Sequence, residues 1–231
     1  ADGSVGLGYN SLRALTSGGS NTAIGQQAGY SLTTPVENTA VGQAALFYNE
    51  TGNYNVAIGR ASMFGVSGNS HNYNTAVGYK SLEGITTGQE NTAVGYLTLQ
   101  SLTSANYITA FGSKAGNALT SGAGLTAVGY QAATSMVDGH SNTAFGYQAL
   151  YSEVASDEST AIGYQALYSQ SGSTSTLGNT AVGHYAGKAT TTAYRNTYVG
   201  KSAALNVTTG QQNTAIGWAA LQNLTNGTSN T

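Results

Sequence analysis

One short pattern of polar and apolar residues recurs along the whole chain. It has the form Asn-Thr-Ala-Val-Gly, with apolar residues alternating with polar or small ones. Copies begin at Ser4, Asn21, Asn38, Asn55, Asn74, Asn91, Ile108, Leu125, Asn142, Ser159, Asn179, Asn196 and Asn213, and a partial copy begins at Asn230. The copies are 17 residues apart, with two extra residues before Asn74 and three before Asn179. We therefore interpret residues 1–231 as a single repeat domain.

The repeat predicts one short strand followed by bends. We number its positions from the first residue of each copy. Position 2 is Thr in eleven copies, position 3 is Ala in eleven, and position 4 is apolar in all thirteen. A β-branched, alternating Thr-Ala-Val segment is typical of a strand. Position 5 is Gly in every copy, from Gly8 to Gly217, which indicates a positive φ or a close backbone approach at a corner.

The length of the repeat selects the architecture. A repeated helical hairpin needs about 34 residues and has few internal glycines. A 17-residue unit rich in Gly fits one coil of a β-solenoid, which is stabilised by stacking on its neighbours. We therefore predict an all-β, parallel β-solenoid of about thirteen coils.

Stacking also explains the low charge of the chain. Charged residues make up 7% of it and the net charge is −2. Equivalent residues of successive coils lie about 4.8 Å apart, so a column of like charges would repel itself. Asn occupies position 1 in nine copies, where its amide could form a structural ladder along the axis or a row of binding residues.

Composition excludes several classes of function. Nucleic-acid binding requires a basic stripe, which this nearly neutral chain lacks. No apolar run is long enough to span a membrane, so we expect no membrane insertion. The absence of Cys removes disulfides, thiolate metal sites and cysteine nucleophiles. We therefore expect no metal and no cofactor.

No constellation of residues suggests catalysis. The three histidines lie in three different repeats. Asp138 and His140 are close in sequence but have no partnered nucleophile, and Asp157 and Glu158 are adjacent, so their side chains diverge. A pair of carboxylates that acts as general acid and base must face a common cleft. We therefore predict that the chain is not an enzyme.

Two aromatic columns are the candidate binding residues. Position 6 is often Tyr, and position 10 is often Tyr or Phe. Aromatic rings stacked at the strand spacing could serve stability alone, or they could form a strip that binds a sugar or a surface. The candidate ligand-binding residues are Tyr147, Tyr151, Tyr164, Tyr168, His184 and Trp218.

The alanine columns bear on assembly. Position 3 is nearly always Ala, and position 8 is always Ala, Ser or Thr. These columns could form a flat surface of small residues at a three-fold axis, or they could fill the narrow interior of one chain. We expect the first arrangement, a parallel homotrimer.

The segments from Asn142 to Leu150 and from Ser159 to Leu167 resemble the repeats of bacterial and phage tail-fibre-like proteins. The Val/Ala/Ile-Gly core also resembles the head of trimeric autotransporter adhesins, a left-handed parallel β-roll made by three chains. Adhesin-head repeats are typically shorter than 17 residues, so the loop side is longer in this chain. The resemblance covers essentially the whole sequence and implies a left-handed β-roll in an extracellular fibre, on a cell surface or a virion.

The expected function is that of a non-enzymatic segment of an extracellular adhesive fibre. Such a segment acts as a spacer shaft or binds a cell-surface glycan or protein receptor. Both ends of the sequence fall inside the repeat, so we expect axial continuation by further fibre protein. One alternative is an ice-binding β-solenoid, which the Thr column at position 2 suggests. We expect the Thr-x-Val pair to point inward, which disfavours this alternative. The other alternative is a self-assembling structural filament subunit.

Overall fold

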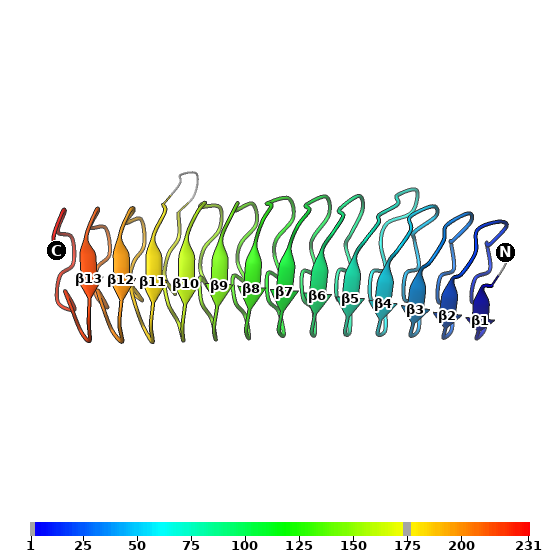
Figure 1. Cartoon of the computed structure of the whole chain (residues 1–231), viewed down its shortest axis with the longest axis horizontal. Coiled ribbons are helices and arrows are strands. Elements are labelled where there is room, and N and C mark those ends of the chain that lie inside the picture. The colour runs from blue at the N-terminus through cyan, green and yellow to red at the C-terminus, as the bar shows by residue number, and fades with distance from the viewer. Residues whose placement is uncertain (1–2, 173–176) are drawn as a thin grey trace. The chain divides into compact units, whose positions relative to one another are not determined.

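The fold consists of short parallel strands joined by loops. A computed structural model describes residues 3–172 and 177–231, and these contain thirteen strands of three residues each and no helix. Within each half of the chain, the strands follow one another in sequence order in a parallel sheet, as Figure 1 shows. This confirms the prediction of an all-β, parallel solenoid.

The chain divides into two compact units, Ala1–Ser113 and Lys114–Thr231. Both are built from the same repeat. The first contains β1 (Val5–Leu7), β2 (Thr22–Ile24), β3 (Thr39–Val41), β4 (Val56–Ile58), β5 (Thr75–Val77), β6 (Thr92–Val94) and β7 (Thr109–Phe111). The second contains β8 (Thr126–Val128), β9 (Thr143–Phe145), β10 (Thr160–Ile162), β11 (Thr180–Val182), β12 (Thr197–Val199) and β13 (Thr214–Ile216).

The strand register follows the repeat. Thr160 pairs with Thr180, and Ala161 with Ala181, although three extra residues separate these two copies. Val56 likewise pairs with Thr75 across the two-residue insertion in the first unit. The insertions therefore lie in the loops, and equivalent positions of neighbouring coils stay beside each other within each unit.

The alanine columns fill the interior of the coils. Ala144 and Ala161 at position 3 are fully buried, as are Ala149 and Ala166 at position 8. Leu150, at position 9, is buried with them. The expected alanine surface at a three-fold axis is therefore wrong. The other reading is correct, because a coil this thin leaves room for little more than small side chains between its walls.

The Asn column is a structural ladder. Asn196 Oδ1 accepts hydrogen bonds from the backbone N–H of Asn213 at 2.8 Å and from its Nδ2 at 3.1 Å. Asn196 Nδ2 donates to Asn179 Oδ1 at 3.0 Å and to the Gly210 carbonyl at 3.0 Å. These side chains are buried, so their amides hold successive coils together and do not face a ligand.

The position-5 glycines meet both conditions that the sequence predicts for them. Gly163 has a φ of +135°, and a Cβ added there would lie 2.4 Å from the carbonyl oxygen of Gly183. Residues other than glycine rarely adopt this φ, and no carbon atom fits at that distance from a backbone oxygen. Each corner that is followed by another described coil therefore requires glycine, whereas at Gly217 an added Cβ meets nothing within 4 Å.

The bend after the corner alternates in handedness. Gln165 at position 7 and Leu167 at position 9 have φ values of +52° and +48°. The alternation sends successive N–H groups to opposite neighbours, because Gln165 donates to the Tyr147 carbonyl of the preceding coil and Leu167 to the Ala186 carbonyl of the next. The bend thus forms hydrogen bonds to both neighbouring coils as a strand does, in the left-handed region that Gly usually occupies.

Candidate functional site: the outer sheet face and the aromatic columns

The outer face of the sheet carries the Thr and apolar columns. Along each strand, position 3 points into the coil, so positions 2 and 4 point outward. Phe145 is 52% exposed and Ile162 38% exposed at position 4, and the threonines beside them are partly exposed. The expectation that the Thr-x-Val pair points inward is therefore wrong. The physical reason is the narrow interior, which accepts Ala and leaves the larger β-branched residues outside.

The position-6 aromatic column lies beside this face in the second unit. Tyr130 stacks on Tyr147 at 5.3 Å between ring centroids, Tyr147 on Tyr164 at 5.0 Å, and Tyr164 on His184 at 5.1 Å. The rings are nearly parallel, so each covers the face of the next. Their edges and polar tips reach solvent, where Tyr147 and Tyr164 are 41% and 40% exposed. A sugar that approaches the column therefore meets hydroxyl groups and ring edges, and not open ring faces.

The position-10 column forms a second, shorter stack. Tyr151 and Tyr168 lie 4.9 Å apart with an angle of 5° between their planes. The ammonium nitrogen of Lys188, at position 10 of the next coil, lies 5.8 Å from the Tyr168 ring centroid. A cation at this distance from an aromatic ring is attracted to its face.

Two residues that the sequence analysis did not select connect the two columns. Tyr185 contacts Tyr164 edge-on at 5.5 Å and His184 at 4.0 Å, and Lys188 Nζ lies 4.3 Å from the Tyr185 ring centroid. We call Tyr164, Tyr168, His184, Tyr185 and Lys188 the aromatic–lysine cluster. Loss of hydration raises the pKa of Tyr164 above its usual value, and Tyr185 and Tyr147 add to the rise. The Tyr164 hydroxyl therefore stays neutral and able to donate.

A sequence signal for these two residues did exist. Position 7 is elsewhere Gln, Ala, Lys, Asn, Leu or Ser, so Tyr185 is the one aromatic residue in that column. Lys188 follows two tyrosines in the position-10 column. These two departures from the residues usual in their columns mark the place where the columns meet.

Trp218 lies apart from the cluster. It is at position 6, but Lys201 occupies that position in the preceding coil and interrupts the aromatic column. Its side chain is 78% exposed, and no ring contact to it occurs in the described part of the chain. The structure thus brings Tyr147, Tyr164 and His184 into one stack and Tyr151 and Tyr168 into another, and leaves Trp218 outside both.

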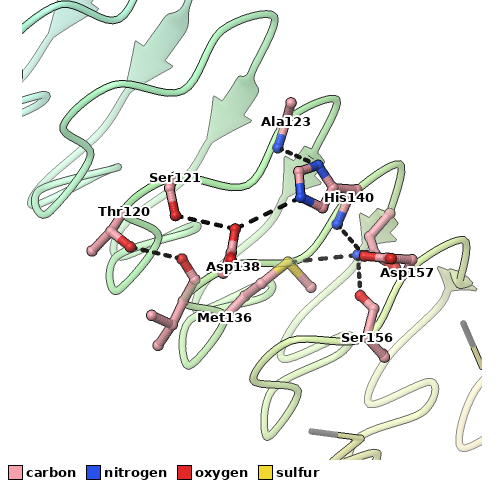
Figure 2. A network of polar contacts seen from close by, with 10 residues as sticks. Thr120, Ser121, Ala123, Met136, Asp138, His140, Ser156 and Asp157 are labelled. Atoms are coloured by element: carbon pink, nitrogen blue, oxygen red, sulfur yellow. Dashed lines mark hydrogen bonds and ion pairs between the residues drawn. The ribbon is translucent and has the colours of Figure 1, made fainter. Parts of the chain in front are cut away.

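Asp138 and His140 belong to a polar network on the loop side, shown in Figure 2. Ser121 Oγ donates to Asp138 Oδ1 at 3.1 Å, and the same oxygen lies 3.7 Å from His140 Nε2. A nucleophilic triad places the imidazole between the hydroxyl and the carboxylate. The carboxylate holds the middle place in this network, so His140 does not contact the Ser121 hydroxyl as a base.

The contacts of His140 have a structural role. The His140 Nδ1 accepts a hydrogen bond from the backbone N–H of Ala123 at 3.2 Å. The backbone N–H of His140 donates to Asp157 Oδ1 at 2.7 Å, as Figure 2 shows. In the first unit, Asn53 Oδ1 accepts the N–H of Val36 in the same way, at 2.8 Å. Position 16 thus supplies a side-chain acceptor to the preceding coil, and His140 fills that place with its ring nitrogen.

Among residues 3–172 and 177–231, no three His, Cys, Asp or Glu side chains gather as a metal site would require. No helix in the same residues is long and apolar enough to cross a membrane. No protein-family profile, curated protein or solved structure matches the chain.

Proposed function

We propose that this chain is a non-enzymatic segment of an extracellular adhesive fibre that assembles as a parallel homotrimer and binds a cell-surface glycan. The observation that carries the proposal is the division of each coil into an interior of small side chains and Asn ladders and a repeated, nearly uncharged outer face. Stacked coils of this kind make a stiff shaft. A column of exposed tyrosines beside the face supplies the contact with a surface.

The outer sheet face, and not the alanine columns, supports the trimer. Position 4 presents Val, Ile or Phe in every coil of the second unit, with Thr at position 2 beside it. Repeated apolar side chains on a surface mark an interaction site. A second copy of the chain fits this face because its columns have the same period, and a closed symmetric assembly places equal residues at the same level.

The phenol hydroxyls of the position-6 column support glycan binding. The Tyr147 and Tyr164 rings cover each other, so a sugar meets their edges and hydroxyl groups. Hydroxyls at regular intervals match the repeated hydroxyl groups of a polysaccharide, and Tyr combines an apolar body with a polar tip. The proposed contact is therefore a row of hydrogen bonds along the column.

Binding of the intact protein to an array of immobilised glycans tests the adhesive function. The double variant Tyr147→Phe, Tyr164→Phe keeps both stacked rings and removes their hydroxyls. We expect it to lose at least tenfold in affinity for the glycans that the wild-type chain binds. Tyr198→Phe is the matched control, because the Tyr198 hydroxyl is fully buried. No binding by the wild-type chain, or equal binding by all three proteins, contradicts the proposal.

Ice binding is the second candidate, and one observation favours it. The Thr column at position 2 faces outward beside a column of apolar groups, on a sheet face with few charges. Such a regular array of hydroxyl and methyl groups could order water as ice does. Thermal hysteresis in a solution of the protein, lost in Thr160→Leu, Thr180→Leu, would support this candidate. A homotrimer that covers the face would exclude it.

A further inference from the structure

We propose that the aromatic–lysine cluster is a binding site for the carboxylate of an acidic saccharide. This inference rests on the proposed adhesive function and names the ligand class for one part of the surface. It starts from Lys188, whose ammonium nitrogen lies 4.3 Å from the Tyr185 ring centroid and 5.8 Å from that of Tyr168. Tyr168 belongs to the position-10 column, and Tyr185 contacts Tyr164 and His184 of the position-6 column, so the site occurs where the two columns meet.

The Lys188 ammonium has no acidic partner in the described part of the chain. The ion pairs there join Lys80 with Glu83 and His140 with Asp138, and neither includes Lys188. An ammonium group has three donors and no acceptor. Its attraction to two ring faces holds the positive charge in place and leaves the N–H groups free to donate to an anion.

The groups around Lys188 suit a sugar that carries the anion. Tyr185, Tyr168 and Tyr164 contribute hydroxyl groups, and the exposed His184 imidazole contributes a further polar edge. A carboxylate at Lys188 would place the hydroxyls of the same sugar ring near these tips. A neutral sugar meets the same hydroxyls but leaves the ammonium unpaired, so the site distinguishes acidic from neutral saccharides.

The position of the cluster within the repeat supports a localised site. The tyrosine column alone repeats through three coils, from Tyr130 to Tyr164. The cation–aromatic contacts in the described part of the chain involve other rings. Tyr185 and Lys188 occur in one coil only, and each departs from the residues that its column usually holds. A single acidic residue of a polysaccharide would therefore be fixed at this coil, while neutral parts extend along the column.

Calorimetric titration of the full chain with an oligouronate, and with a neutral oligosaccharide of the same length, tests the inference. Lys188→Met keeps the apolar stem and removes the charge, Lys188→Arg restores the charge, and Lys201→Met removes an exposed cation from the next coil as a matched control. We expect Lys188→Met to bind the oligouronate at least tenfold more weakly, while Lys188→Arg and Lys201→Met bind within threefold of wild type. Binding of the neutral oligosaccharide should be the same for all four proteins.

Several results would overturn the inference. Equal loss in Lys188→Met and Lys201→Met would show attraction to net charge, and no loss in either would show that Lys188 takes no part. If free acetate competes with the oligouronate at the same concentration, the cluster is a simple anion site and does not recognise the sugar. If the chain binds neutral glycans through Tyr147 and Tyr164 but does not bind the oligouronate, this inference fails and the adhesive function stands. If it binds no glycan of either kind, both fail.

Discussion

The glycine at position 5 packs directly against the backbone of the following coil. Its side-chain hydrogen lies against the backbone of the next coil, so even a methyl group collides with a carbonyl that is fixed by its own hydrogen bonds. The sequence predicts this position well, because it is glycine in every copy, and a strict requirement for glycine indicates a constraint from the backbone.

Gly163→Ala measures that demand. The substitution combines an unfavourable φ of +135° with a Cβ placed 2.4 Å from the Gly183 carbonyl oxygen. We expect it to lower the free energy of unfolding by about 3 kcal/mol or more. Gly178→Ala is the control: its φ is +56° and an added Cβ meets nothing within 4 Å, so we expect a loss of about 1 kcal/mol. Equal losses in urea denaturation would contradict the close packing of the corner.

His71 makes stability in the first unit depend on pH. It is fully buried, and neither ring nitrogen has a hydrogen-bond partner. Burial lowers its pKa from 6.5 to about 4. The unfolded chain therefore binds a proton more readily than the folded one, so stability is complete above pH 6.5 and falls as the pH drops towards 4. A difference of this size corresponds to about 3 kcal/mol.

His71→Phe isolates the effect, because Phe fills the space with a ring that does not titrate. Denaturant unfolding of both proteins between pH 7.5 and pH 4 gives the comparison. We expect the free energy of unfolding of the wild-type chain to drop by about 3 kcal/mol relative to the variant over this range. Parallel pH profiles for the two proteins would show that His71 does not titrate in this way.

Other features at the residue scale could not be predicted. Leu167 has a φ of +48°, yet nothing in a leucine signals the left-handed region. The conformation follows from the hydrogen bonds that the bend makes to both neighbouring coils, and these exist only once the coils are stacked. A pattern within one repeat contains no trace of them.

The Asn ladder at position 1 connects successive coils. Where a coil lacks Asn at this position, another side chain can continue the hydrogen bonds. Ser159 replaces Asn in the second unit, and the buried side chain of Gln170 supplies the missing amide. Gln170 Nε2 donates to Ser159 Oγ at 2.9 Å, and its Oε1 accepts from Asn179 Nδ2 at 2.9 Å. The ladder of side-chain amides is thus continued by a residue that lies at a different position of the repeat.

Asn196→Ala tests the ladder. The change removes the side-chain partner of the Asn213 backbone N–H and of the Gly210 carbonyl, and it takes one hydrogen bond from each of the Asn179 and Asn213 amides. Unpaired buried polar groups cost about 1–3 kcal/mol each, so we expect a loss of about 3 kcal/mol in the free energy of unfolding. Asn206→Ala, at an exposed Asn, should change it by less than about 0.5 kcal/mol. Indistinguishable unfolding curves for the two variants would show that the ladder does not stabilise the fold.

The strands themselves were predictable from the repeat, but their orientation was not. Alternation in Thr-Ala-Val shows that position 3 faces opposite to positions 2 and 4, without showing which side is buried. The thin interior decides the matter. Tyr198 at position 3 fits inside because Gly187 replaces Leu at position 9, where a Cβ would lie 2.7 Å from the Tyr198 ring. The available volume, which no single repeat reveals, excludes Val and admits Ala.

For the whole molecule, the sequence gives the number of coils and their order, and the aromatic columns follow from that order. The aromatic–lysine cluster was only half predictable. Tyr164, Tyr168 and His184 follow the columns, whereas Tyr185 and Lys188 are found through contacts between coils. From the sequence, the Thr-x-Val pair is expected to be buried and the interface to lie at the alanine columns, whereas the proposed trimer uses position 4.

A charge on the outer face should dissociate the proposed trimer. We expect light scattering of the wild-type chain to report three times the 23.4 kDa mass of one chain. Ile162→Asp, Val182→Asp should give the mass of a single folded chain, because apolar contacts do not tolerate buried, unpaired charges. Val154→Asp, at a comparably exposed apolar residue of a loop, should leave the wild-type mass unchanged. A wild-type chain that is already monomeric refutes the trimer and leaves the solenoid intact.

The most direct measurement is an electron cryomicroscopy map of the assembled fibre at side-chain resolution. In the proposed fibre, alanines fill each coil and position 4 joins the copies. The map should show three parallel chains, with Ile162 and Val182 facing the three-fold axis and Ala161 enclosed within its own coil. Contacts between copies made by Ala161, or a single chain with its outer face in solvent, would contradict the account.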